Sequence, residues 1–178
     1  TDGTPRPQMV DQWSTSPDGL VWEFSLREGL TFHDGAPVTA TDVVASLRRW
    51  GARDADGRQI VAVTVKLSAV RSDRLVWRLN KPYGLLLHAL SKPGGPVAAI
   101  MPARIATTAP TTSIEESVGS GPYICDENAW IPGAKVVYRR NTDYIPRSEP
   151  ANATSGGKHV NVDVVEWINI RDPQSAVL

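Results

Sequence analysis

The sequence predicts a mixed α/β fold, and three patterns carry that prediction. Residues 20–27, LVWEFSLR, alternate apolar and polar side chains with the period of two that is typical of a half-buried strand. Residues 40–50 repeat apolar side chains at helical spacing. Residues 60–70 alternate again, and after a polar turn residues 75–79 do the same. A chain of 178 residues with these elements fits one domain, or a domain made of two small parts.

The first pair of strands is predicted to be a hairpin of residues 9–14 and 20–27. The turn between them contains SPDG, residues 16–19, in which Pro17 presets φ and Gly19 permits a positive φ. The apolar face of the second strand is expected to consist of Leu20, Trp22, Phe24 and Leu26.

A loop and a capped helix are expected next. Residues 28–37, EGLTFHDGAP, are punctuated by Gly and Pro and therefore predict a loop. Thr39 and Asp42 have the T-x-x-D spacing of a capping box, with Asp in place of Glu. The helix should run over residues 40–50 and end at Gly51. Its apolar stripe consists of Val43, Val44, Leu47 and Trp50.

The alternation in residues 60–70 and 75–79 predicts a second hairpin, with Val61, Val63, Val65 and Leu67 on one face of its first strand. A short helix should follow Pro82 and end before PGGP at 93–96. The remaining segments are predicted as a short helix or strand over 97–106, a loop over 107–117, strands over 134–141 and 162–170 with a long loop between them, and a helix that starts at Asp172 and Pro173.

Composition excludes several classes of function. The 19 basic and 19 acidic residues cancel and no long basic run occurs, so nothing points to nucleic acid. No apolar stretch reaches the ~18 residues that a membrane-spanning helix needs. The start, TDGTPRPQMV, lacks the apolar region of a signal peptide, so any such signal lies outside this chain. Six Trp residues are spread along the chain; most are expected in the core, with one or two available to line a ligand cleft.

The residue types that carry chemistry do not assemble into a catalytic pattern. His33 and Asp34 are adjacent, and neighbours on an extended chain point apart, whereas a dyad needs the carboxylate to orient the ring. The Asp34–Gly35 pair predicts a turn, so a structural role is favoured over an enzyme that uses His33 and Asp34. The three histidines lack metal-ligand spacing, and no phosphate-binding glycine loop is present, so no cofactor is expected.

Two further features have ordinary interpretations. The single Cys125 cannot form an internal disulfide and has no histidine near it in the sequence, so packing or surface placement is favoured over reactivity. Arg139, Arg140 and Arg147 would attract an anion, but a solvated strand edge is the favoured interpretation.

The order of the motifs adds a resemblance. Residues 13–50, WSTSPDGLVWEFSLREGLTFHDGAPVTATDVVASLRRW, resemble the signature of bacterial extracellular solute-binding proteins of family 5, the dipeptide, oligopeptide and nickel receptors of ABC importers. Residues 63–92, 119–147 and 162–178 resemble later segments of the family in the right order. Ser120 in GSGPY stands where the family more often has Thr, which is a mild departure.

The resemblance implies a two-lobed fold of the periplasmic-binding-protein type, class II, peptide-binding group. Residues 1–118 would be the subdomain characteristic of peptide-binding receptors, and residues 119–178 would be part of the first ligand-binding lobe. The second lobe would lie outside this chain, which would then be a fragment. Gly121 and Tyr123 are expected near the ligand cleft, with Tyr83 and Trp130 as weaker candidates; for each, simple packing is the alternative.

The implied function is capture of a peptide, a nickel complex or a related small solute for uptake. The partners would be that ligand and the permease subunits of an ABC importer, with no nucleic acid and with membrane attachment only through a lipid anchor outside this chain. The expected location is the periplasm or the outer face of the cell membrane. The alternative is the solute-sensing domain of a cytoplasmic transcriptional regulator, which a DNA-binding domain outside this chain would reveal.

Overall fold

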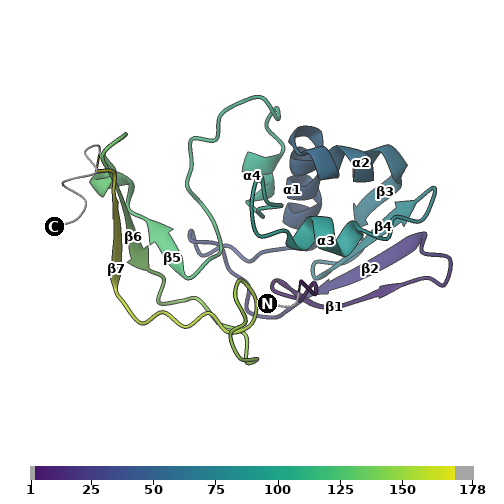
Figure 1. The fold of residues 1–178 in the computed structure, drawn as a ribbon, viewed down its shortest axis with the longest axis horizontal. Helices are drawn as coiled ribbons and strands as arrows, with labels where there is room; N and C mark the ends of the chain where they lie inside the picture. The colour runs from purple at the N-terminus through teal and green to yellow at the C-terminus, as the bar shows by residue number, and fades with distance from the viewer. Residues whose placement is uncertain (1–2, 171–178) are drawn as a thin grey trace.

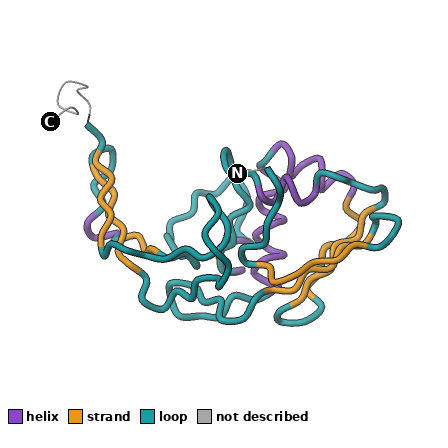
Figure 2. Tube along the Cα trace, turned by 60° about the horizontal axis from the view of Figure 1, so that its bottom comes forward, coloured by secondary structure: helices purple, strands orange, loops and turns teal. Residues whose placement is uncertain are grey.

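Two antiparallel sheets organise the protein, whose computed structural model describes residues 3–170. The first sheet has the strand order β1-β2-β4-β3 and is packed against helices α1 to α4; we call these elements the body. The second sheet, β5-β6-β7, stands to one side of the body in Figure 1, and we call it the arm. In Figure 2 the helices lie over one face of the four-stranded sheet. The predicted mixed α/β class is confirmed.

The hairpin of β1 (Val10–Thr15) and β2 (Val21–Leu26) is confirmed. Gly19 adopts φ 69°, and its N–H donates to the Ser16 carbonyl at 2.8 Å, which closes the predicted turn. The face of β2 expected to be apolar packs inward, with Trp22, Phe24 and Leu26 all buried.

Helix α1 (Ala40–Arg53) begins where the capping box predicts. The Asp42 carboxylate accepts from the Thr39 N–H at 2.8 Å and from its hydroxyl at 2.6 Å. The predicted stop at Gly51 is wrong, because the helix continues to Arg53. Gly51 instead allows a close approach: a Cβ there would lie 2.6 Å from Val61 Cγ2 of the next helix.

Helix α2 (Ala55–Val63) occupies residues that the sequence predicted in part as a strand. Asp54 ends α1 and caps α2, since its carboxylate accepts from the N–H groups of Asp56 and Gly57, each at 3.0 Å. The prediction that Val61, Val63, Val65 and Leu67 share one face of a strand is also wrong. Val63 and Leu67 are buried, whereas Val61 and Val65 are 49% and 65% exposed.

The second predicted hairpin is confirmed from Thr64 onward. It consists of β3 (Thr64–Ala69) and β4 (Arg74–Leu79), which pair in antiparallel fashion. β4 pairs with β2 as well, so Trp77 lies directly across from Trp22 in the middle of the core. Two short helices follow, α3 (Leu86–Ser91) and α4 (Ala103–Ala106), and the extended chain after α4 leads to the arm.

The arm consists of β5 (Tyr123–Cys125), the single turn η1 (Glu127–Ala129), β6 (Lys135–Arg140) and β7 (Val164–Ile168). The strands predicted over 134–141 and 162–170 are therefore confirmed. The helix start predicted at Asp172 and Pro173 lies outside the described residues.

The arm buries little of its apolar surface. Trp167 is 69% exposed and contacts the Tyr138 ring edge-on, with the ring centres 6.4 Å apart. Of the six Trp residues, Trp22, Trp50 and Trp77 are buried in the body, while Trp13, Trp130 and Trp167 are exposed, so fewer are in the core than expected. Within residues 3–170 none of the helices has both the length and the apolar content to cross a bilayer.

Candidate functional site

The HDG turn of the body meets the GSG segment that leads into the arm, and His33 is at the centre of this contact. The His33 backbone N–H donates to the Gly119 carbonyl at 2.8 Å. Its ring lies between two backbone N–H groups, with Nδ1 3.2 Å from Gly119 N and Nε2 3.1 Å from Gly121 N. We call these contacts the joint. The expected structural role of His33 and Asp34 fits them, because Asp34 accepts from the Ala36 N–H at 3.1 Å and closes the turn.

Asn141, at the end of β6, contributes to the same joint. Its buried side chain donates to the Gly121 carbonyl at 3.1 Å, and its own N–H donates to the Pro122 carbonyl at 2.9 Å. An open cavity of about 330 Å³ adjoins these residues. It is lined by Gly29, Thr31, Phe32, His33, Gly35, Ile124, Arg140, Asn141, Thr142, Asp143 and Ile145.

Of the four residues expected to face a ligand, Gly121 lies at the joint and Tyr123 follows it two residues later in the chain. Gly121 faces open space on the side where a Cβ would project, since no atom lies within 4 Å of that position. Tyr123 begins β5, and its hydroxyl donates to the Val162 carbonyl at 3.2 Å, so its ring is tied to the strand entering β7. Their contact with a ligand stays a prediction.

The other two are on separate surfaces. Trp130 follows η1 in the arm and is 49% exposed. Tyr83 precedes α3 in the body, where its ring packs on the core and its hydroxyl reaches Gln59 Oε1 of α2 at 3.4 Å. Among the described residues no hydrogen bond or ring contact joins either of them to Gly121 or Tyr123.

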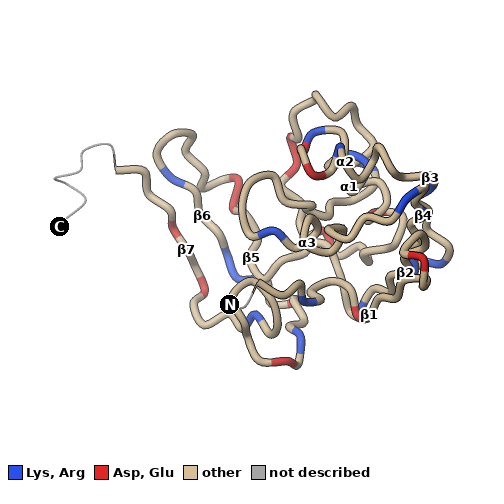
Figure 3. Tube along the Cα trace, turned by 45° about the vertical axis from the view of Figure 1, so that its right-hand side comes forward, with Lys and Arg blue, Asp and Glu red and all other residues tan. Residues whose placement is uncertain are grey.

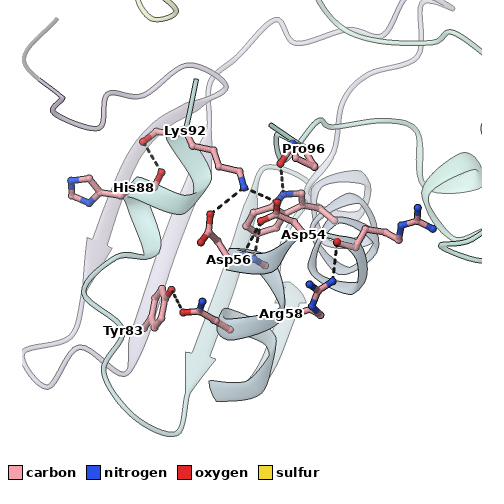
Figure 4. Close-up of polar contacts among 12 residues, drawn as sticks. Asp54, Asp56, Arg58, Tyr83, His88, Lys92 and Pro96 are labelled. Atoms are coloured by element: carbon pink, nitrogen blue, oxygen red, sulfur yellow. Dashed lines mark hydrogen bonds and ion pairs between the residues drawn. The ribbon is translucent and has the colours of Figure 1, made fainter. Parts of the chain in front are cut away.

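Tyr83 lies instead beside a charged cluster at the corner between α1 and α2, shown in Figure 4. Lys92, just after α3, places its ammonium 2.6 Å from Asp54 Oδ2 and 3.1 Å from Asp56 Oδ2. The same ammonium lies 5.7 Å from the centre of the Trp50 ring, a cation–π distance. The Trp50 indole N–H donates to the Pro96 carbonyl at 3.0 Å, so the corner also fixes the chain after α3.

The electrostatics of this corner follow from burial and pairing. Burial acts to raise the pKa of Asp54, but hydrogen bonds from Lys92 and the Gly57 N–H outweigh it and hold that pKa below its ordinary value. The hydrogen bond to Asp54 raises the pKa of Lys92. Two carboxylates share one ammonium, and Asp56 is the more exposed of the two, at 45%.

Sequence reasoning missed this corner. DAD at residues 54–56 was a visible signal, because Asp is a strong N-cap residue, but the alternating pattern of residues 60–70 hid the helix that it caps.

Replacing Asp54 with alanine should lower the free energy of unfolding by about 2–4 kcal/mol, because the change removes a helix cap and leaves Lys92 without its closest partner. Asp56→Ala is the matched control: it removes an exposed partner of the same lysine and should cost less than about 1 kcal/mol. Urea unfolding of both variants measures the difference, and equal losses would contradict the assignment of Asp54 as the structural anchor.

The charged residues of the arm are largely paired with opposite charges, and Figure 3 shows acidic and basic positions interleaved along both parts of the molecule. Arg139 lies 2.7 Å from Asp126, and Arg140 lies 3.2 Å from Asp163.

Cys125 is half-buried on β5. Within residues 3–170 no three His, Cys, Asp or Glu side chains come together as a metal would require.

Comparison with known proteins identifies the relatives of this fold. The profile described as bacterial extracellular solute-binding proteins, family 5 middle, matches residues 4–178. A probable peptide ABC transporter periplasmic-binding protein of Sinorhizobium fredii is 39% identical over 175 residues, which are 97% of this chain and 32% of the relative. The nickel-binding periplasmic protein of Escherichia coli is 27% identical over 149 residues, covering 80% of this chain and 27% of that protein.

Solved structures agree with the sequence comparison. NikA from Brucella suis, solved in complex with Fe(III)-EDTA, matches 95% of this chain and 32% of its own length with a TM-score of 0.73 at 25% identity. The chain therefore spans about a third of the length of the proteins that it matches. Because the profile covers almost every residue and the fold agrees, the chain belongs to the bacterial extracellular solute-binding proteins of family 5.

Proposed function

We propose that this chain is part of the substrate-binding component of an ABC importer, which captures a peptide, a nickel complex or a related small solute outside the cytoplasm. The observation that carries the proposal is the family match over residues 4–178, supported by the 39% identity to a probable peptide-binding relative. The relatives are named as a probable peptide-binding protein and a nickel-binding protein, and these two roles suggest the range of solutes.

The parts of the chain receive roles on the same basis. Residues 1–118 would form the subdomain typical of peptide-binding receptors, and residues 119–178 would begin the first ligand-binding lobe. The proposed solute-facing residues are Gly121 and Tyr123, then Trp130 and Tyr83. Open space beside Gly121 and the exposure of Trp130 support access by a solute.

The proposed partners are the solute and the membrane permease subunits of the importer. The proposed location, the periplasm or the outer face of the cell membrane, rests on the periplasmic relatives. Any membrane attachment would be through a lipid anchor outside this chain.

Thermal unfolding of the complete gene product tests the proposal. A panel of di- to pentapeptides and of nickel–histidine complexes should include a ligand that raises Tm in a saturable way, because a ligand at about 100 times its Kd stabilises by about 2.7 kcal/mol. No shift with any peptide, amino-acid derivative or metal complex would contradict it.

Paired variants test the solute-facing residues. Trp130→Ala should weaken binding of that ligand in calorimetry, whereas Trp167→Ala, which removes a second exposed arm tryptophan, should leave the affinity unchanged. Equal effects would remove Trp130 from the site.

A further inference from the structure

Helix α1 has a second buried face beside the apolar one that packs on the core. Asp42, Ser46 and Arg49 follow one another at spacings of four and three residues, so they lie on one side of the helix. Their exposed fractions are 9%, 1% and 8%. We call these three side chains the polar face. It contacts residues 101–112, which we call the strap, and whose helix α4 lies beside α1 in Figure 1.

Two side chains of the polar face bind the beginning of the strap. Asp42 Oδ1 accepts from the Ala103 N–H at 2.7 Å, while its other carboxylate oxygen caps α1. The Ser46 hydroxyl donates to the Met101 carbonyl at 3.1 Å and accepts from the Met101 N–H at 3.0 Å. Both backbone groups of Met101 are therefore bound by one side chain, which satisfies polar groups of the strap where it enters the contact with α1.

Arg49 binds the end of the strap. Its guanidinium donates to the carbonyls of Thr108 at 2.7 Å, Ala109 at 3.0 Å and Thr112 at 2.7 Å, and to the Thr108 hydroxyl at 2.9 Å. These acceptors are uncharged, so the buried cation is held by carbonyl dipoles. A guanidinium carries its donors in a rigid planar fork, which suits it to bind several carbonyls at once.

The end of the strap depends on these contacts. Residues 108–112 are exposed, and among the described residues their hydrogen bonds to α1 come from Arg49 and from Arg53, which reaches the Pro110 carbonyl at 3.1 Å. Water can replace the donors at exposed carbonyls, so loss of the guanidinium would free this end of the strap to move away from the helix.

The strap leads to the joint through further contacts. Arg104 of α4 lies 2.9 Å from Asp34 of the HDG turn and 2.9 Å from Glu116. Glu116 precedes Gly119 of the joint by three residues, and Val118 between them packs partly on the core. Exposed ion pairs such as those of Arg104 are weak by themselves, so the fixed point of this connection is the buried polar face.

We propose that Arg49, together with Asp42 and Ser46, fixes the path of the strap by holding its backbone. Arg49 is thereby a positioning residue for Gly121 and Tyr123, at the start of the arm. The importance of those two residues rests on the proposed function, in which they face the solute. The hold on the strap itself requires no solute.

Hydrogen exchange of the complete gene product, measured by mass spectrometry, tests the proposal. Arg49→Met keeps much of the apolar length of the side chain and removes its donors. Exchange in residues 101–112 and in residues 117–123 should become about tenfold faster, because both segments open more often. Peptides from β2 should exchange as in the unmodified protein.

Two control variants separate this role from a general effect of the substitution. Arg53→Met removes an exposed arginine of the same helix, which makes a single contact with the strap, and should change exchange little. Thr108→Ala removes the side-chain acceptor of Arg49 and keeps the carbonyl, so it should leave exchange unchanged if the backbone is what Arg49 holds.

Calorimetry then separates positioning from stability. With the ligand identified by thermal unfolding, Arg49→Met should weaken binding about tenfold, within the range that residues outside a site contribute to coupling. Val43→Ala is the control, because Val43 lies on the apolar face of α1 and is 7% exposed. It should lower Tm and leave the affinity unchanged.

Three results would overturn the proposal. The first is faster exchange that is confined to residues 101–112, and the second is an equal loss of affinity in Arg49→Met and Val43→Ala. The third covers the case in which Arg49→Met does not fold: Ser46→Ala, which removes one hydroxyl, should also speed exchange in both segments, and unchanged exchange would count against the polar face. If the unmodified protein binds no ligand, the proposed function fails and the exchange results alone decide the role of Arg49.

Discussion

Replacing Trp77 with alanine should lower the free energy of unfolding by about 3–5 kcal/mol, the usual cost of removing a buried large aromatic side chain. Trp77 is 2% exposed and lies across from Trp22 in the paired strands β2 and β4. Its indole N–H also donates to the Thr64 hydroxyl at 2.8 Å, so the truncation leaves a cavity and a hydroxyl without its donor. Guanidinium unfolding monitored by circular dichroism measures the loss.

Trp167→Ala is the matched control for that experiment, because it removes the same side chain from a site that is 69% exposed. We expect a change of less than about 1 kcal/mol, since only the edge contact with Tyr138 is lost. A loss at Trp167 as large as that at Trp77 would contradict the expectation that burial in the body determines the size of the effect.

Replacing Arg147 with methionine should cost about 2–4 kcal/mol, although the change keeps much of the side chain's length. Arg147 is 9% exposed and binds the Glu149 carboxylate through two nitrogens at 2.9 and 2.6 Å. A third nitrogen reaches the Val10 carbonyl, so one side chain links the loop after β6 to β1. Arg147→Lys should recover only part of the loss, because an ammonium cannot reproduce the paired geometry.

The same pair predicts an acid dependence. Hydrogen bonds from Arg147 lower the pKa of Glu149 from 4.5 to about 2. A carboxyl with a depressed pKa contributes stability that is fully present above its unfolded pKa and is lost as the pH falls through the folded one. The unmodified chain should therefore lose stability between pH 4.5 and about 2 more steeply than Glu149→Gln. Parallel curves would contradict the pairing.

The sequence was sufficient for elements in which several local signals agree. The first hairpin has strict alternation together with a turn of suitable residues, and α1 has an apolar stripe together with a capping box. In each case the local signals and the tertiary contacts favour the same conformation, so local patterns are enough to predict it.

The sequence misled where one pattern supports two structures. The run IVAV at residues 60–63 fits both a period of two and a helical face, and Asp54, six residues earlier, decides for the helix. Gly51 was a plausible helix end, but its lack of a side chain serves the contact with α2. Both outcomes depend on contacts between elements, which spacing alone does not reveal.

The candidate site was likewise predictable in its local parts but not in the contacts between them. His33 and the GSG segment were each recognisable, but 86 residues separate His33 from Gly119, and no local rule brings them together. Arg147 was expected on a solvated strand edge and is instead buried. Its ion pair with Glu149, two residues away, offsets the desolvation cost of burying the guanidinium. Lys92 and Asp54 likewise come from separate elements.

The contacts at the joint also have a consequence for the order of folding. The His33 contacts connect residues 86 and 88 positions apart, and the separate contact of Arg147 with Val10 connects residues 137 positions apart, whereas the strands of the first hairpin are neighbours along the chain. Closing such long loops costs entropy before the contacts form, so the body should assemble early and the arm should dock onto it late. Interactions that form after the transition state mainly determine how fast a protein unfolds. Weakening the joint should therefore accelerate unfolding and leave the folding rate of the body nearly unchanged.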